Sequence, residues 1–62
     1  MPEIVVHLAA GRTTAQKKAL MKDITDAVVR NLGVPPERIV VQIVESAKAD
    51  KSRGGVPYDE TP

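Results

Sequence analysis

Pro2 has the most unusual chemical potential in the chain, because it directly follows the initiator methionine and opens an apolar segment. A small second residue favours removal of Met1, which would leave a secondary amine at the start of that segment. Apolar surroundings and nearby cations both lower the pKa of an amine, since they disfavour its protonated form. A base works best when its pKa lies near ambient pH. Pro2 is therefore the candidate general base.

Arg12 is the candidate anchor for a carboxylate. It lies at the expected entrance of a helix, where the macrodipole disfavours a cation, so another interaction should hold it. A carboxylate bound bidentately by the guanidinium group suits that role. Three further cations, Arg38, Lys51 and Arg53, are weaker candidates for substrate binding, because solvated surface explains each of them individually better than function does.

His7 and Tyr58 carry less specific signals. His7 stands among apolar residues, which favours a packed or interface histidine over a catalyst. Tyr58 could pack across a subunit boundary or lie in solvent, and the sequence does not decide between these. The chain has no cysteine, which excludes disulfides and thiolate metal sites. We expect neither a metal nor a cofactor.

The order of elements predicts a βαβ unit. Residues 2–9 form an apolar segment typical of a strand that is covered on both faces. Thr13 and Gln16 have the spacing of a capping box, and Gly33 suits a left-handed helix end, so a helix is predicted from about 13 to 32. The apolar residues of this helix follow its periodicity: Leu20, Ile24, Ala27, Val28 and Leu32.

The β-branched segment 39–44 predicts a second strand. Two strands joined by a long helix should be parallel, with a right-handed crossover. Gly54-Gly55 predicts a short C-terminal hairpin, and residues 58–62 are expected to fray. The fold class is α/β, with residues 1–62 forming a single domain.

Size and charge narrow the class of protein. A chain of 62 residues buries little surface, and two strands with one helix leave open sheet edges, so we expect self-association. The net charge of +1 and the single aromatic residue speak against nucleic-acid binding. No apolar run approaches the ~20 residues of a membrane span, and no signal peptide is recognisable, which predicts a soluble, cytoplasmic protein.

Several short motifs, each weak alone, occur together in a fixed order: Pro2-Glu3-Ile4, Gly11-Arg12-Thr13, Gln16-Lys17, Glu45-x-Ala47-Lys48 and Gly54-Gly55. In this order the chain resembles the small tautomerases of the 4-oxalocrotonate tautomerase family from Pro2 to about Val56. The resemblance implies a hexamer built as a trimer of dimers, in which two units pair into a four-stranded sheet. It also implies an N-terminal proline base, a carboxylate-binding arginine at Arg12, no cofactor, and a role in the degradation of aromatic compounds.

The chain departs from the family pattern at two positions. Without gaps, the family's second arginine falls on Val40 and its aromatic wall on Lys51. Arg38 would share a face with Val40 if the chain is extended there. Any of Arg38, Lys51 or Arg53 could restore the missing positive charge.

The leading hypothesis is a cofactor-independent isomerase that ketonises a small 2-hydroxydienoate or the enol of a 2-oxo acid, with Pro2 as the base. One alternative keeps Pro2 protonated for dehalogenase, hydratase or decarboxylase chemistry, with Glu45 or Asp50 as weak candidates to activate water. Another is a non-catalytic subunit of a mixed oligomer, which the absence of the second arginine motivates.

Overall fold

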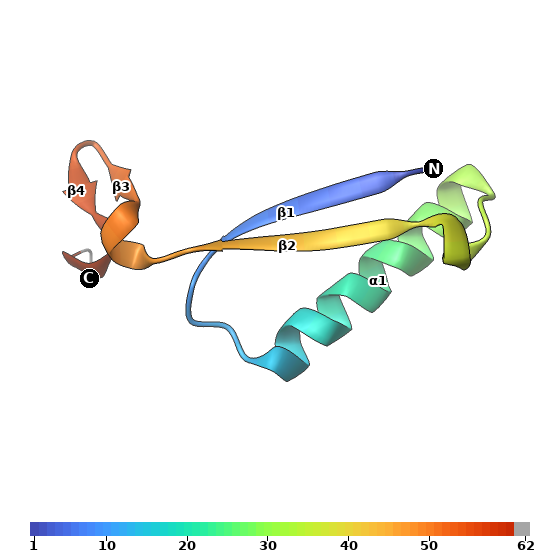
Figure 1. Cartoon of the computed structure of the whole chain (residues 1–62), viewed down its shortest axis with the longest axis horizontal. Helices are drawn as coiled ribbons and strands as arrows, with labels where there is room; N and C mark the ends of the chain where they lie inside the picture. The colour runs from blue at the N-terminus through green and yellow to red at the C-terminus, as the bar shows by residue number, and fades with distance from the viewer. Residues whose placement is uncertain (61–62) are drawn as a thin grey trace.

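A computed structural model describes residues 1–60 as a βαβ unit followed by a small C-terminal arm (Figure 1). Strand β1 spans Glu3–Ala9, helix α1 spans Thr14–Leu32 and strand β2 spans Val40–Ser46. β1 and β2 pair in parallel, with Glu3 opposite Val40 and Ala9 opposite Ser46. The predicted parallel βαβ unit is confirmed.

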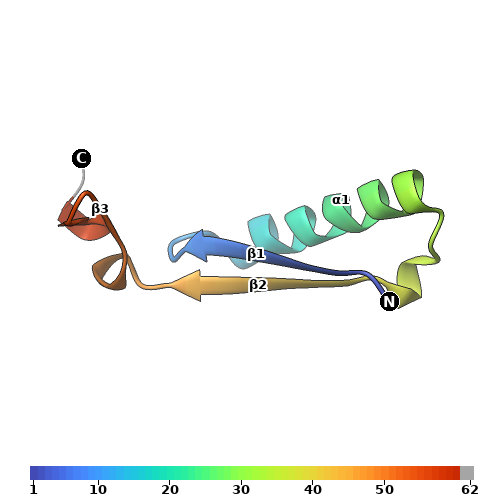
Figure 2. The ribbon, with the colours of Figure 1, turned by 90° about the horizontal axis from the view of Figure 1, so that it is seen from above.

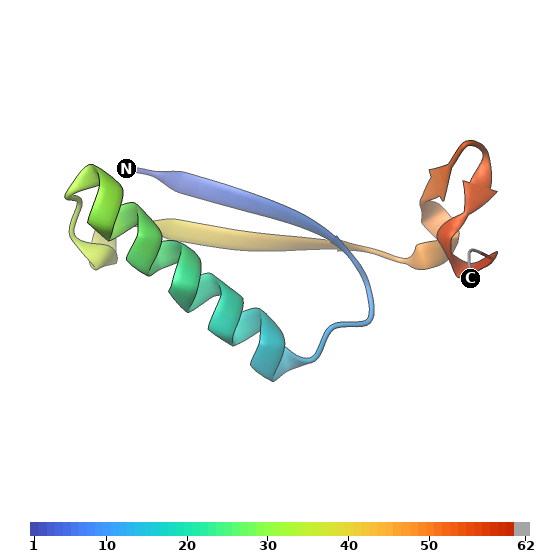
Figure 3. The ribbon, with the colours of Figure 1, turned by 180° about the vertical axis from the view of Figure 1, so that it is seen from behind.

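Helix α1 covers one face of the two-stranded sheet and leaves the other face open (Figures 2 and 3). Side chains alternate along β1, so Ile4 and Val6 are partly buried whereas Val5 and His7 are exposed. The apolar residues of the open face have no covering layer within one chain. Coverage of both faces, which the sequence predicts, therefore requires contacts beyond the single chain.

Both ends of α1 follow from local chemistry. The Gln16 backbone N–H donates to Thr13 Oγ1, and the Thr13 backbone N–H donates to Gln16 Oε1, each at 3.0 Å. At the other end Gly33 adopts φ 66° and its N–H donates to the Val29 carbonyl. The predicted capping box and left-handed helix end are both confirmed.

The apolar stripe of α1 is rotated from the one that the periodicity predicts. Met21, Ile24 and Val28 are partly buried, whereas Leu20 and Leu32 are 36% and 63% exposed. The ion pair of Lys17 with Glu45 on β2 orients the Lys17 side of the helix over the sheet. The two leucines therefore lie beside the covered stripe instead of at its centre.

The arm contains the predicted hairpin. Strands β3 (Ser52–Arg53) and β4 (Val56–Pro57) pair antiparallel. Gly54 and Gly55 form the turn with φ values of 60° and 84°, a region that favours glycine. The prediction of a Gly-Gly hairpin is therefore confirmed.

Three 3-10 turns complete the elements of residues 1–60: η1 at Pro36–Arg38, η2 at Lys48–Asp50 and η3 at Tyr58–Glu60. The last of these differs from the expectation of a frayed end from residue 58, because the Tyr58 N–H donates to the Lys51 carbonyl at 2.7 Å and joins this turn to the hairpin. Residues 61 and 62, which the same expectation included, lie outside the described residues.

The single chain is elongated and thin, with extents of 42 × 23 × 14 Å. The arm projects beyond the end of the strands, opposite the N-terminus (Figures 1 and 2). None of residues 1–60 is fully buried. Because burial of apolar surface is the main stabilising term in folding, this shape needs further contacts to become stable.

Candidate active site

Pro2 lies at the start of the paired strands. Its carbonyl accepts a hydrogen bond of 3.0 Å from the Val40 backbone N–H, and the residue is partly buried. In the described chain Met1 precedes it and is 87% exposed. Removal of Met1 would therefore disturb no packing and would leave an amine whose position is set by strand pairing.

Arg12 lies at the opposite end of β1. The strand pair ends with a 2.8 Å hydrogen bond from the Ala10 N–H to the Ser46 carbonyl, after which Gly11, at φ 126°, turns the chain toward the helix. The seven residues of β1 span about 23 Å at the usual rise of a strand. Pro2 and Arg12 of the same chain are thus too far apart to contact one small substrate.

Arg38 lies at the same end of the sheet as Pro2. It closes the 3-10 turn η1, and extended backbone begins only after it. The condition under which it would share a face with Val40 is therefore not met, because a 3-10 turn does not alternate its side chains as a strand does. Arg38 is exposed and makes no side-chain hydrogen bond or ion pair to residues 1–60.

Lys51 and Arg53 lie in the arm, beyond the end of the strands that carries Arg12. Lys51 Nζ and Arg53 Cζ are each 6.0 Å from the centroid of the Tyr58 ring. That distance is within the range of cation–π attraction. The structure therefore separates the predicted residues into two groups, with Pro2 and Arg38 at one end of the sheet and the other three cations toward the opposite end.

Two residues in this region were not predicted as site residues. The Cε and Nζ atoms of Lys48 lie about 4 Å from the point that a Cβ on Gly11 would occupy, which places this lysine beside the turn that leads to Arg12. Tyr58 is the shared neighbour of Lys51 and Arg53. The signal for Lys48 was available in the sequence, because parallel strands end at the same edge and this residue lies two positions after the last residue of β2.

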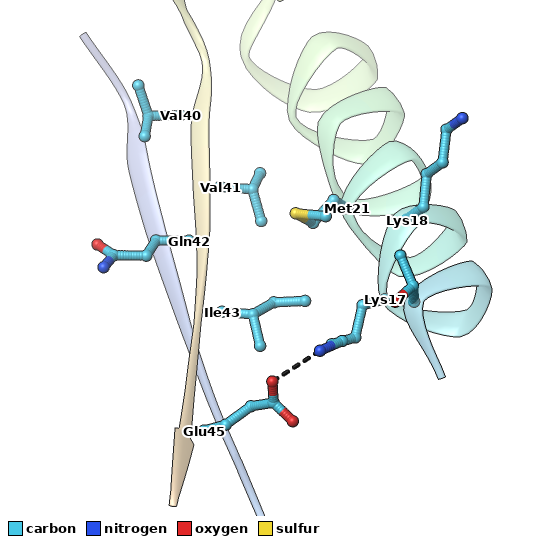
Figure 4. Close-up of a pocket in the computed structure, with 9 residues that line it drawn as sticks. Lys17, Lys18, Met21, Val40, Val41, Gln42, Ile43 and Glu45 are labelled. Atoms are coloured by element: carbon cyan, nitrogen blue, oxygen red, sulfur yellow. Dashed lines mark hydrogen bonds and ion pairs between the residues drawn. The ribbon is translucent and has the colours of Figure 1, made fainter. Parts of the chain in front are cut away.

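An open groove of about 660 Å³ runs between α1 and the outer edge of β2 (Figure 4). Met21, Val41 and Ile43 point into it, and Gln42 points to the other side of the sheet. At one end Lys17 Nζ lies 2.7 Å from Glu45 Oε1. The groove is not lined by the candidate base or by the candidate cations, although Glu45, a weak candidate to activate water, does line it.

Three further observations on residues 1–60 concern His7, metal binding and membrane insertion. His7 is exposed on the open face of the sheet, opposite Val44. Among residues 1–60, no group of three or more histidine, aspartate or glutamate side chains is arranged to hold a metal ion. Within the same residues, α1 is too polar to cross a membrane and no other helix has the length.

The fold is a small parallel βαβ unit with Pro2 directly before its first strand. A sequence profile described as tautomerase enzyme matches residues 2–59. The chain is 48% identical over 60 residues to a probable tautomerase of Bradyrhizobium diazoefficiens, covering 97% of this chain and 90% of that protein.

Solved structures agree with the sequence matches. YwhB, a homologue of 4-oxalocrotonate tautomerase, superposes with a TM-score of 0.88 at 33% identity over 98% of this chain and 100% of its own. A 4-oxalocrotonate tautomerase isozyme of Methylibium petroleiphilum superposes with a TM-score of 0.87 at 36% identity, covering 94% and 91% of the two chains. The chain belongs to the tautomerase family, and it is an isomerase of the 4-oxalocrotonate tautomerase type.

Proposed function

We propose that this isomerase ketonises a small 2-hydroxydienoate, or the enol of a 2-oxo acid, with the amine of Pro2 as the general base. Family membership supports the reaction type. The single observation that carries the assignment of the base is the position of Pro2. Its carbonyl pairs with Val40 while its nitrogen lies at the free start of β1, next to an exposed Met1.

The reaction needs a base and an anchor but no cofactor. The lone pair of the Pro2 nitrogen accepts the proton of the 2-hydroxyl group, and the O–H bonding electrons become the carbonyl π bond. The double bonds of the substrate shift along its carbon chain, and the distal carbon of the substrate takes a proton back from the prolinium ion. A guanidinium group that binds the carboxylate bidentately holds the substrate in register for both transfers.

Arg12 supplies that guanidinium group from a second copy of the chain. The backbone groups of Pro2 and Ala10 hydrogen-bond to Val40 and Ser46, so the even-numbered residues of β1 face β2. The odd-numbered residues from Glu3 to Ala9 direct their backbone N–H and C=O groups toward the free edge of β1. If two copies pair antiparallel along this edge, the start of one β1 lies beside the end of the other. The Pro2 nitrogen of one copy then approaches Arg12 of its partner.

The same pairing accounts for the expected assembly. It joins two strand pairs into a four-stranded sheet and removes one open edge from each copy. The apolar open faces of such dimers remain uncovered, which favours packing of dimers against one another. The hexameric trimer of dimers that the family resemblance implies would satisfy both requirements.

Ion pairing weakens the case for water-activating chemistry with a protonated proline. Glu45, one of the two candidates to activate water, accepts a 2.7 Å hydrogen bond from Lys17 on the helix-covered face. One of its carboxylate oxygens is therefore occupied by an ammonium group and is less available to bind a water molecule. A role for Pro2 as general base therefore fits the geometry better than a role for protonated Pro2 as an acid.

The test is Pro2→Ala, assayed by ultraviolet absorbance on a panel of dienols with protein whose mass confirms removal of Met1. Loss of a general base typically lowers turnover by about 100- to 10,000-fold. Protein that retains Met1 should be equally inactive, because its Pro2 nitrogen is a tertiary amide. Lys22→Ala on the exposed side of α1 is the control and should keep wild-type turnover.

The pH dependence separates the two roles of Pro2. With a base, kcat/KM rises as pH rises through the pKa of the Pro2 amine, and with an acid it falls over the same range. Wild-type turnover in Pro2→Ala would refute the proposal. Native mass spectrometry of the active species addresses the mixed-oligomer alternative, since robust turnover by a homo-oligomer would reject it.

A further inference from the structure

Two cations follow the last hydrogen bond of the strand pair at equal spacing. The Ala10 N–H donates to the Ser46 carbonyl at 2.8 Å, where the ends of β1 and β2 lie side by side (Figure 1). Arg12 lies two residues beyond this bond on one segment, and Lys48 lies two residues beyond it on the other. Because two residues span at most about 7 Å, the backbone of both cations stays close to this end of the sheet.

The Lys48 side chain extends toward the turn that carries Arg12. Its Cε and Nζ atoms lie 3.9 and 4.0 Å from the point that a Cβ on Gly11 would occupy. Since Arg12 is one Cα–Cα step further along the chain, Lys48 Nζ lies within about 9 Å of Arg12 Cα. The arginine side chain is long enough for its guanidinium group and this ammonium group to contact one small anion.

Neither of these two charges is neutralised within residues 1–60. Glu45, three residues before Lys48, is paired with Lys17 at 2.7 Å. Asp50 belongs to the same 3-10 turn as Lys48 but forms no ion pair with it. Like charges on adjacent segments repel each other unless an anion lies between them, so this arrangement favours a bound anion.

We propose that Lys48 is a further substrate-binding residue, whose ammonium group contacts the same carboxylate that Arg12 holds. This inference rests on the proposed function, which assigns that carboxylate to the substrate. Arg12 fixes the plane of the carboxylate through its paired donors, whereas the ammonium group of Lys48 is a compact charge that adds affinity without fixing a direction. Lys48 therefore contributes to binding of the substrate more than to the proton transfers.

The experiment measures binding of sorbate, a dienoate with one carboxylate and without the 2-hydroxyl group that the reaction needs. An NMR titration of isotope-labelled protein follows the backbone amide of Gly11, which lies between the two cations. Lys48→Met keeps an apolar stem beside Gly11 but removes the charge, and we expect it to bind sorbate about 10-fold more weakly than wild type. Lys48→Arg should retain most of the affinity, because it keeps the charge.

The neutral amide of sorbate separates the charge of Lys48 from its packing. Wild-type protein and Lys48→Met should bind this amide equally, and Lys22→Met on the exposed side of α1 should bind sorbate as wild type does. High salt should reduce the difference between wild type and Lys48→Met, because both cations are exposed. Wild-type affinity of Lys48→Met for sorbate would overturn the proposal, and so would an equal loss of affinity for the amide.

Turnover gives a second measurement of the same role. Lys48→Met should raise KM about 10-fold with kcat close to wild type, since the contact is made equally in the bound substrate and in the transition state. A lower kcat at unchanged KM would contradict a binding role.

The outcome is separable from that of the proposed function. Pro2→Ala should show the same dependence of sorbate binding on Lys48, because sorbate needs no base. If Pro2→Ala retained full turnover, the assignment of the base would fail while the effect of Lys48→Met on binding would stand. If Arg12→Gln weakened sorbate binding and Lys48→Met did not, only the role of Lys48 would be rejected.

Discussion

The two ends of the strand pair differ in how they hold their functional groups. At one end, backbone hydrogen bonding to Val40 places Pro2. At the other, Arg12 extends from an exposed turn between Gly11 and the capped start of α1, with a cationic arm beyond it. The first end positions a residue through the main chain, and the second exposes cationic side chains.

If Pro2 and Arg12 act as proposed, the separation of these ends means that one chain carries two half-sites. A proton-transfer group gains from rigid placement, since misplacement by about 1 Å can cost 100-fold in rate. An anion-binding group tolerates longer, more mobile side chains, because charge attraction is less directional. Antiparallel association of two copies would bring Pro2 of one copy close to Arg12 of the other.

The largest effect is expected from mixing two impaired variants. Arg12→Ala should lower kcat/KM by about 10- to 100-fold, because a charge-assisted contact to the carboxylate is lost. Pro2→Ala should be inactive as argued above. After the two variants are denatured together and refolded, roughly a quarter of the sites in a symmetric dimer should hold an intact Pro2 and an intact Arg12 from different copies. Activity should return to about that fraction.

Refolding each variant alone is the control and should restore nothing. If the two residues acted within one chain, no mixture would contain an intact site and activity would stay at the level of the variants. A lack of recovery in mixtures that native mass spectrometry shows to be hybrid would therefore contradict the two-copy site. Arg12→Lys in place of Arg12→Ala should retain part of the binding, since it keeps the charge but loses the bidentate geometry.

Much of the fold could be predicted from the sequence, because local signals determine it. The capping box of Thr13 and Gln16, Gly33 in the left-handed region and Gly54-Gly55 in the hairpin turn each depend on neighbours within a few residues. Parallel pairing followed from the length of the helical connection. These features depend little on contacts between residues that are distant in the sequence.

The arrangement of the site could be predicted only in part. The resemblance pointed to Pro2 and Arg12, but their separation along β1 became evident only once the strand had a length and a direction. Arg38 lies in a 3-10 turn and not in β2, and this turn depends on Pro35 and Pro36. The pattern of apolar residues does not predict such a turn. The convergence of Lys51 and Arg53 on Tyr58 required the fold of the arm.

A second comparison uses the two ends of α1. Thr13→Ala removes a cap and Gly33→Ala forces a side chain into the left-handed region, and each should lower the free energy of unfolding by about 1 kcal/mol. Only Thr13 adjoins Arg12. Thr13→Ala should therefore also raise KM about 2- to 5-fold by loosening the anion-binding turn, whereas Gly33→Ala should leave KM unchanged.

Denaturant titration at a fixed protein concentration measures the stability changes, because association with further copies contributes to them. No atom lies within 4 Å of a Cβ placed on Gly33, so its effect is confined to backbone strain. An equal change in KM for both variants would mean that the two ends of the helix respond as one unit. That result would contradict the proposed difference between the Pro2 end of the strand pair, which is held by backbone hydrogen bonds, and the Arg12 end, which lies on an exposed turn.

The smallest effects are expected from the two ion pairs. Lys17 and Glu45 join α1 to β2 at the Arg12 end with side chains 24% and 33% exposed, whereas Lys22 and Asp26 pair within the helix at 74% and 51%. Double-mutant cycles should give a coupling of up to about 1 kcal/mol for the first pair and about 0.3 kcal/mol for the second. Salt should weaken the second pair more, because its charges are better solvated. A stronger coupling within the helix than between helix and strand would show that the Lys17–Glu45 pair contributes little to holding α1 over the Arg12 end.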